Sequence, residues 1–292
     1  MIDFGSIEQM LKDAAEAGTP LWQRILLSDC EQQGISEAQS LAKMKNLLQA
    51  MKETDGSYRE TDRSRSGLSG GDAAKVMQYT AKADPLCGAF ITDVIAGALR
   101  TAECNACMKR IVAAPTAGSC GILPAVLLSY VRHFGSSDKE LIRALYVASG
   151  FGIVIANRAS ISGAEGGCQA EIGSASAMAA AALVQLEHGT AEQMANACAM
   201  AIKSLLGLVC DPVGGLVEVP CVKRNVIGAM NALSCAQMAL AGVESRVPPD
   251  QVLDAMREVG LSLPPSLRET GKGGLAATPY GQLFWQRDQT NR

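Results

Sequence analysis

Helix-start signals recur along this chain and constrain its fold more than any other feature. Three segments place a Ser or Thr three residues before a Glu or Gln, just ahead of an apolar-periodic run: Ser36 to Gln39, Ser137 to Glu140 and Thr190 to Gln193. This is the capping box of an α-helix. Clear period-two alternation, which marks half-buried strands, is hard to find. The pattern predicts an all-α, multi-helix fold.

The composition favours the same fold class. Hydrophobic residues make up 48% of the chain but aromatic residues only 4%, and 29 glycines are present. Such a mix is typical of closely packed helices with small residues at their contacts, whereas sheets favour aromatic and β-branched side chains. We expect helices near 6–17, 20–33, 37–53, 72–83, 87–103, 122–134, 138–155, 174–187, 191–206, 222–242 and 250–259.

A polar segment rich in Gly and Ser, residues 52–72, separates the first three expected helices from the rest. Polar linkers of this kind mark boundaries between structural units. We therefore expect an N-terminal helical segment, 1–60, packed on a main all-helical domain, 61–292, that contains the functional site.

Charge and hydropathy exclude several classes of partner. The net charge is −3 and no Lys/Arg-rich stripe is present, so neither nucleic acid nor an anionic membrane surface is an expected partner. The acidic, amphipathic stretch 1–16 has neither the pattern of a signal peptide nor that of a transit peptide. Two long uncharged stretches, 111–131 and 225–243, contain breakers or polar residues and are expected to be buried helices. These features predict a cytoplasmic protein.

Four loops rich in Gly or Pro interrupt the expected helices: 66–72, 114–121, 162–167 and 211–215. In helical proteins such loops free the backbone to meet a ligand. Three of the ten cysteines lie close to the last two loops. Cys168 directly follows 162–167, Cys210 directly precedes 211–215, and Cys221 lies six residues after that loop. Cysteine is an iron–sulfur ligand, but the spacing C-x41-C-x10-C matches no short general motif. The residues alone leave metal ligands and ordinary buried thiols both open.

The more conspicuous cysteine pattern is the C-x-x-C of Cys104 and Cys107. Such a pair indicates zinc, a cluster or a redox couple, or else two thiols on one buried helix face. We favour the buried face, because no second C-x-x-C lies nearby. The cysteines expected in the helical core are Cys30, Cys87, Cys198 and Cys235. His133 and His188 fall near expected helix ends, outside any zinc-hydrolase pattern.

The loop 114–121, APTAGSCG, precedes an apolar helix and offers hydroxyls at Thr116 and Ser119. Free backbone N–H groups at such a position can bind a carboxylate. The loop 66–72 offers a second site of the same kind. An ordinary helix cap is the alternative for both loops.

Three long runs resemble a known family. APTAGSCGILPAVL (114–127), SISGAEGGCQAEIGSASAMAAAA (160–182) and CDPVGGLVEVPCVKRN (210–225) are similar to the iron–sulfur-dependent L-serine dehydratases, also called L-serine ammonia-lyases. The length and the order of the runs match the separate α subunit of the two-subunit bacterial form.

The resemblance implies an all-helical catalytic domain with a [4Fe–4S] cluster. The implied cluster ligands are Cys168, Cys210 and Cys221. The implied substrate-binding residues, near the substrate carboxylate, are Thr116, Ala117, Gly118 and Ser66. The C-x-x-C pair is not part of the family pattern, which supports the buried-face interpretation.

The resemblance also implies a reaction and a partner. The single-chain form has a C-terminal cysteine for the fourth iron, whereas this chain ends RDQTNR. We therefore expect an open iron that acts as a Lewis acid on the hydroxyl of L-serine, giving pyruvate and ammonia in serine catabolism and gluconeogenesis. A separate β subunit would supply the missing N-terminal domain of the single-chain form, and an oligomer is expected. The catalytic base is not identified.

Three alternatives stay open at this point. The first is a cysteine desulfidase on the same scaffold, which would eliminate sulfide in place of water. The second is a non-catalytic iron–sulfur sensor subunit. The third is a structural zinc protein, in which the cysteines would hold a redox-inert ion.

Overall fold

The computed structural model describes residues 4–82 and 84–290, and every regular element in these ranges is helical. The long helices are α1 (Ile7–Glu16), α2 (Leu21–Gln33), α3 (Glu37–Gly56), α4 (Asp72–Lys82), α5 (Gly88–Ala106), α6 (Ile122–Phe134), α7 (Asp138–Arg158), α9 (Ser174–Leu186), α10 (Ala191–Lys203), α11 (Cys221–Leu240), α12 (Pro249–Ser262) and α13 (Pro279–Thr290). Short segments between them are η1 (Ala117–Ser119), α8 (Gly163–Gly166), η2 (Gln169–Gly173), η3 (Val213–Gly215), η4 (Pro265–Leu267) and η5 (Gly274–Ala277). The all-α prediction is confirmed.

Helix starts follow the sequence signals closely. Ser36, Ser137 and Thr190 each cap a helix, and the Gln or Glu three residues later returns the hydrogen bond. The expected helices are present with ends shifted by at most three residues, and the expected end at position 83 lies outside the described residues. Helices α8 and α13 were not predicted, because α8 is one turn inside a glycine-rich run and α13 lacks a clear apolar stripe.

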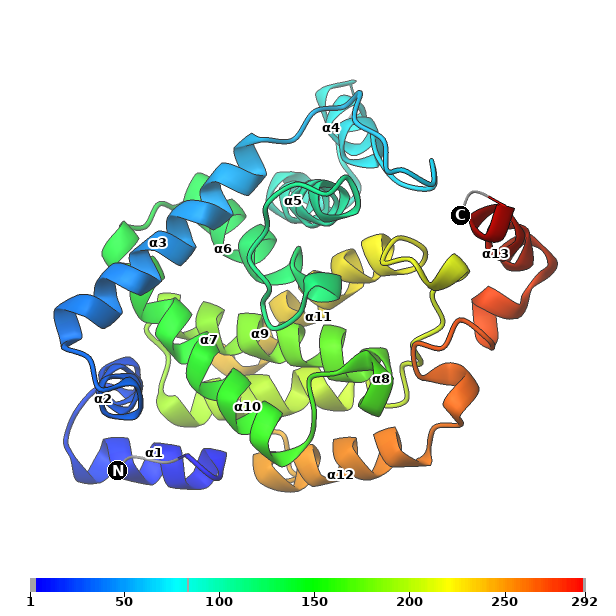
Figure 1. Ribbon diagram of the computed structural model, residues 1–292. Coiled ribbons are helices and arrows are strands. Elements are labelled where there is room, and N and C mark those ends of the chain that lie inside the picture. Colours follow the sequence, from blue (N-terminus) through cyan, green and yellow to red (C-terminus); the bar gives the residue numbers. More distant parts are fainter. Residues whose placement is uncertain (1–3, 83, 291–292) are drawn as a thin grey trace.

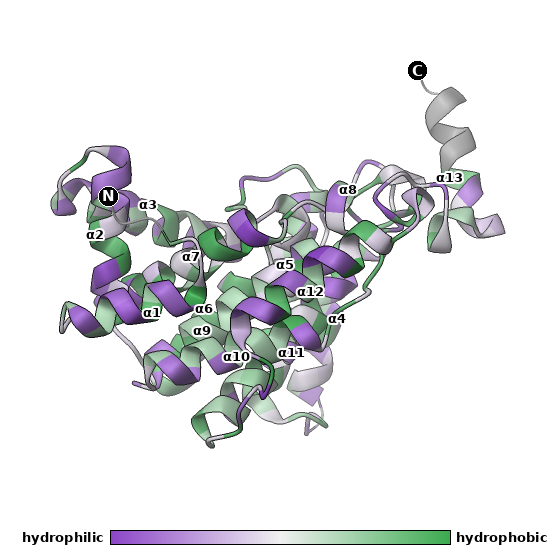
Figure 2. Cartoon of the chain, turned by 90° about the horizontal axis from the view of Figure 1, so that it is seen from below, coloured by the Kyte–Doolittle hydropathy of each residue, from purple (hydrophilic) through white to green (hydrophobic). Residues whose placement is uncertain are grey.

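Helix α9 is the centre of the fold and packs against α6, α7, α10 and α11 (Figure 1). Of its 13 residues, 12 are buried, and most of these are Ala or Ser. Small side chains let the neighbouring helices approach on every side, and the core keeps its close packing without large residues. Hydrophilic residues gather on the outer helices, for example on α1 and α12 (Figure 2).

Helices α1 to α3 pack on this core. Phe4 and Ile25 are buried in the same hydrophobic cluster as the side chains of α6, α7 and α9. The Asp250 carboxylate at the start of α12 accepts a hydrogen bond from the backbone N–H of Ile7 (2.8 Å), which ties α1 to the main body. The division of the chain at residue 60 stays a prediction.

Helix α7 is the one helix in the described ranges that is long and apolar enough to cross a membrane. Here it packs against α2, α3 and α9. Its large side chains Tyr146 and Phe151 are fully buried. The apolar composition of α7 therefore matches its place in the core of the fold.

Candidate active site

The three cysteines of the family pattern come from three different elements. Cys168 lies immediately before η2, a π-helical turn that leads into α9. Cys210 lies in an extended segment that pairs with Arg268 in a parallel bridge. Cys221 is the first residue of α11. Because π-helical turns are rare and occur frequently at functional sites, the position of Cys168 beside one is consistent with a functional role.

All three thiols are buried, with exposed fractions between 2% and 8%. Burial raises the pKa of the Cys168 and Cys221 thiols to about 12, and it also raises the pKa of Cys210. Cys168, Glu171, Cys221 and Glu269 raise the pKa of Cys210 further by the negative charge that they carry when ionised, so these groups lie within electrostatic reach of Cys210. The metal-free thiols are therefore held in the protonated form, which bound iron would deprotonate.

A half-buried arginine lies beside this cysteine group. Arg224, one turn into α11, donates to the backbone carbonyl of Val209 (2.7 Å) and to the Asp211 carboxylate (2.9 Å). Its positive charge opposes the rise in the pKa of the Cys168 thiol that burial causes. Asp211 accepts a further bond from the backbone N–H of Leu275. The pair therefore fixes the segment around Cys210 and places a positive charge next to sulfur.

In the described part of the chain, no group of three or more His, Cys, Asp or Glu side chains is placed to hold a metal ion. A four-iron cluster makes a different demand, because each cysteine binds its own iron and the sulfurs stand apart around the cluster. Three buried thiols, which become thiolates when they bind iron, fit that demand in donor chemistry, and the positive charge of Arg224 beside them favours the thiolate form.

The loop 114–121 is attached to the cysteine helix α11 by a buried amide. Asn225 accepts a hydrogen bond from the backbone N–H of Gly121 (2.8 Å). Its amide group donates to the carbonyls of Gly118 (2.8 Å) and Cys221 (2.9 Å). A single side chain thus holds the predicted carboxylate loop against one of the predicted cluster ligands.

A carboxylate lies between this loop and the cysteines. Thr116 donates its hydroxyl to Glu171 Oε1 (2.7 Å). A methyl group on Gly118 would come within 3.0 Å of the same oxygen, so the glycine leaves room for the carboxylate. Burial raises the pKa of Glu171, the Thr116 hydrogen bond opposes the rise, and the charge of Glu269 adds to it.

Ser66, the fourth predicted substrate-binding residue, is bound to the loop that precedes Cys221. Its Oγ lies 2.9 Å from each carboxylate oxygen of buried Glu218, and Ser64 donates to the same carboxylate (2.6 Å). The structure thus brings the 66–72 loop to the cysteine side of the molecule. The hydroxyl of Ser66 is directed to Glu218 in this arrangement.

The far end of the 66–72 loop is held by Glu103, which is 1% exposed. Its carboxylate accepts hydrogen bonds from the backbone N–H groups of Asp72 (2.7 Å) and Ala73 (3.4 Å), at the start of α4. A negative charge at this position also interacts favourably with the helix dipole.

Replacing Glu103 by Ala should lower the free energy of unfolding by about 2 kcal/mol, because two N–H groups lose a charged acceptor in a buried place. Urea denaturation of the metal-free chain measures this. Glu53→Ala is the matched control, since the Glu53 side chain is 52% exposed and its loss should cost less than about 0.5 kcal/mol. Equal stability of Glu103→Ala and Glu53→Ala would contradict the capping role.

The comparison with known proteins decides the family. The model of the family described as serine dehydratase alpha chain matches residues 10–276. The chain belongs to this family.

Three relatives show how far the similarity extends. The chain is 55% identical over 219 residues to a probable L-serine dehydratase, alpha chain, from Bacillus subtilis (strain 168), covering 75% of this chain and 73% of the relative. It is 49% identical over 212 residues to the L-serine dehydratase, alpha chain, of Peptoniphilus asaccharolyticus, covering 73% of each. The L-serine dehydratase TdcG of Escherichia coli (strain K12) is 45% identical over 181 residues, which are 61% of this chain but 40% of the relative.

Sequence reasoning about this serine dehydratase family member missed Glu171, Arg224 and Asn225 as site residues. A signal for Glu171 was present, because it is the only charged residue between positions 166 and 186. Arg224 and Asn225 follow Cys221 at helical spacing, but the sequence does not show that this face of α11 meets two loops.

Cys120 is buried within the loop 114–121, whereas the other remaining cysteines and the histidines lie outside the site loops. Cys104 is buried near the end of α5 and Cys107 is half-buried just beyond it. Burial raises the pKa of both thiols. Cys87 was expected in the core but is exposed, because it lies ahead of the first turn of α5. His133 belongs to the last turn of α6, where it approaches Asp93 (3.4 Å).

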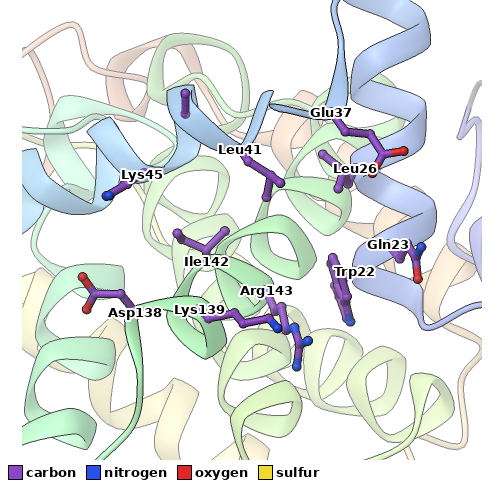
Figure 3. A pocket seen from close by; sticks show the side chains of 11 residues that line it. Trp22, Gln23, Leu26, Glu37, Leu41, Lys45, Asp138, Lys139, Ile142 and Arg143 are labelled. Carbon is purple, nitrogen blue, oxygen red and sulfur yellow. The ribbon is translucent and has the colours of Figure 1, made fainter. Parts of the chain in front are cut away.

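A cavity of about 460 Å³ lies between α2, α3 and α7, where Arg143 stacks over Trp22 (Figure 3). Its lining shares no residue with the cysteine loops or with the loop 114–121. This cavity is therefore separate from the cysteine loops and from the loop 114–121.

Proposed function

We propose that this chain is the α subunit of a cytoplasmic L-serine dehydratase, which deaminates L-serine to pyruvate and ammonia. The observation that supports this most is that three buried cysteines, from distant parts of a chain in the serine dehydratase alpha-chain family, lie within electrostatic reach of one another. The names of the relatives supply the substrate and the α designation.

We propose Cys168, Cys210 and Cys221 as the ligands of a [4Fe–4S] cluster. When bound, such a cluster supplies an iron with a free coordination position, a Lewis acid that helps the substrate hydroxyl to leave. Arg224 stabilises the negative charge of the Cys168 sulfur and holds the Cys210 segment through Asp211.

Thr116, Ala117, Gly118 and Ser66 are proposed to hold the substrate carboxylate. In the structure the backbone N–H groups of Ala117 and Gly118 have no hydrogen-bond partner among the described residues. These two donors are therefore free for a carboxylate, whereas the Thr116 hydroxyl is already donated to Glu171. Asn225 keeps the loop at a fixed distance from α11.

The proposal includes a separate β subunit, in keeping with the alpha-chain names of the relatives. An oligomer follows from that partnership. The group that removes the Cα proton is not assigned on this chain. No role with nucleic acid or membranes is proposed.

Anaerobic reconstitution with iron and sulfide, followed by assays with L-serine and L-cysteine, tests the function. We expect pyruvate and ammonia in equal amounts from L-serine when the β subunit is present, and bleaching of colour and activity together in air. Sulfide release from L-cysteine as the faster reaction would favour the desulfidase. A stable cluster without turnover of either amino acid would favour a sensor, and a colourless zinc-rich protein a structural zinc site.

A further inference from the structure

Glu171 has an unbalanced negative charge. Its carboxylate is half-buried between the loop 114–121 and the cysteine segments, and its one hydrogen bond comes from the neutral hydroxyl of Thr116. No Lys or Arg of the described residues forms an ion pair with it. Partly buried carboxylates in proteins normally have a cationic partner, because desolvation of an unpaired charge is costly.

Arg224, the arginine beside the cysteines, donates instead to the Val209 carbonyl and the Asp211 carboxylate. A second carboxylate, Glu269, raises the pKa of Glu171 further. Among the described residues, the site therefore holds two carboxylates near each other, and Glu171 has no ion-pair partner.

Two carboxylates and a predicted cluster ligand converge around Gly163. A methyl group at this glycine would lie 2.9 Å from Glu171 Oε2, 3.2 Å from Glu269 Oε2 and 3.1 Å from Cys210 Sγ. Because glycine has no side chain, these three groups can pack closely against its Cα. Glu269 is held there by its backbone N–H, which donates to the Cys210 carbonyl (2.8 Å), and it adopts a left-handed φ of 62° that is uncommon for a residue with a side chain.

We propose that Glu171, assisted by Glu269 at the rim, binds the α-ammonium group of the amino-acid substrate and makes the enzyme prefer amino acids to hydroxy acids. This inference rests on the proposed function, because it takes L-serine as the substrate. It assigns a substrate group to Glu171, for which neither sequence nor family resemblance gave a role.

The arrangement of the site matches the way in which the polar groups of serine are attached to a single carbon. The ammonium, carboxylate and hydroxymethyl groups diverge from one carbon, so the three places that receive them must adjoin. The carboxylate loop touches Glu171 through Thr116, and Glu171 Oε2 and Cys210 Sγ both pack against Gly163. Oε2 of Glu171 has no hydrogen-bond partner among the described residues and can accept from an ammonium.

The test compares L-serine with 3-hydroxypropionate, which keeps the carboxylate and the hydroxyl but lacks the ammonium group. The reconstituted enzyme with its β subunit is assayed for the KM of L-serine and for competitive inhibition by 3-hydroxypropionate. Glu171→Gln should raise the KM of L-serine about 10- to 100-fold, with a smaller change in kcat, since a charged hydrogen bond is lost from substrate binding. Inhibition by 3-hydroxypropionate should stay the same or become stronger.

Glu165→Gln is the matched control, because Glu165 lies six positions earlier, in α8, is exposed and accepts a hydrogen bond from Ser160. It should leave both constants unchanged. Glu269→Gln should act in the same direction as Glu171→Gln but less strongly, and it provides a second variant if Glu171→Gln fails to fold, which circular dichroism reports. An equal weakening of both ligands, or a fall in kcat alone, would overturn the inference. Failure of the wild-type enzyme to convert L-serine would instead overturn the proposed function.

Discussion

Replacing Cys168 by Ser should abolish both the visible absorbance of the reconstituted chain and its turnover of L-serine. A buried serine hydroxyl is a poor iron ligand compared with a thiolate, and two cysteines cannot hold a cubane cluster in place. Because Cys168 is 2% exposed and enclosed by protein, solvent cannot readily replace the lost ligand. The measurements are the iron content, the absorbance spectrum and the rate of pyruvate formation, all under anaerobic conditions.

Cys107→Ser is the matched control for this variant. Cys107 belongs to the C-x-x-C pair and lies half-buried just beyond the end of α5. It should keep iron content, colour and turnover near the wild-type values. Full activity of Cys168→Ser, or loss of the cluster only in Cys107→Ser, would refute the assignment of the ligands and return the C-x-x-C to consideration.

The second large effect is expected on stability. Arg224→Gln should lower the free energy of unfolding of the metal-free chain by about 3 kcal/mol, because it leaves the Asp211 carboxylate buried without its cation. The side chains of this pair are 15% and 5% exposed, so solvent screens their interaction little. Urea denaturation of the wild type and the variant gives the difference. Arg110→Gln, at a residue whose side chain is 75% exposed, should change stability by less than about 0.5 kcal/mol.

A double-mutant cycle separates the ion pair from simple packing loss. Asp211→Asn combined with Arg224→Gln should cost less than the sum of the two single variants, because neither charge is then left alone. Strict additivity, or an Arg224→Gln variant as stable as the wild type, would show that the pair does not fix the Cys210 segment.

The fold was predictable to the extent that local signals determine it. Ser36, Ser137 and Thr190 form the capping boxes that their spacing indicates, since a cap depends on four consecutive residues and not on tertiary contacts. One-turn segments such as α8 escaped prediction, because their geometry is imposed by the loops that pack on them. Cys87 was placed in the core by its helical surroundings, yet the chain exposes it ahead of α5.

The site was predictable only where motif resemblance reached it. Their spacing alone did not distinguish Cys168, Cys210 and Cys221 from the other seven cysteines. The runs that resemble the family identified them as the predicted cluster ligands. The partners that hold the site together are long-range contacts: Asn225 joins α11 to a loop more than a hundred positions earlier, and Glu218 joins Ser66 to the Cys221 loop. No local pattern encodes such pairs. The charge imbalance at Glu171 likewise appears only when the surrounding loops are in place.

We propose that this chain and its β subunit form an L-serine dehydratase whose activity depends on iron held by the three cysteines. The most direct measurement is a titration of the metal-free chain with iron and sulfide in the presence of the β subunit, followed by pyruvate formation from L-serine at each step. We predict that activity rises with bound iron and levels off at about four irons per chain. Full turnover of L-serine by the iron-free protein would show that the reaction does not depend on iron held by the three cysteines.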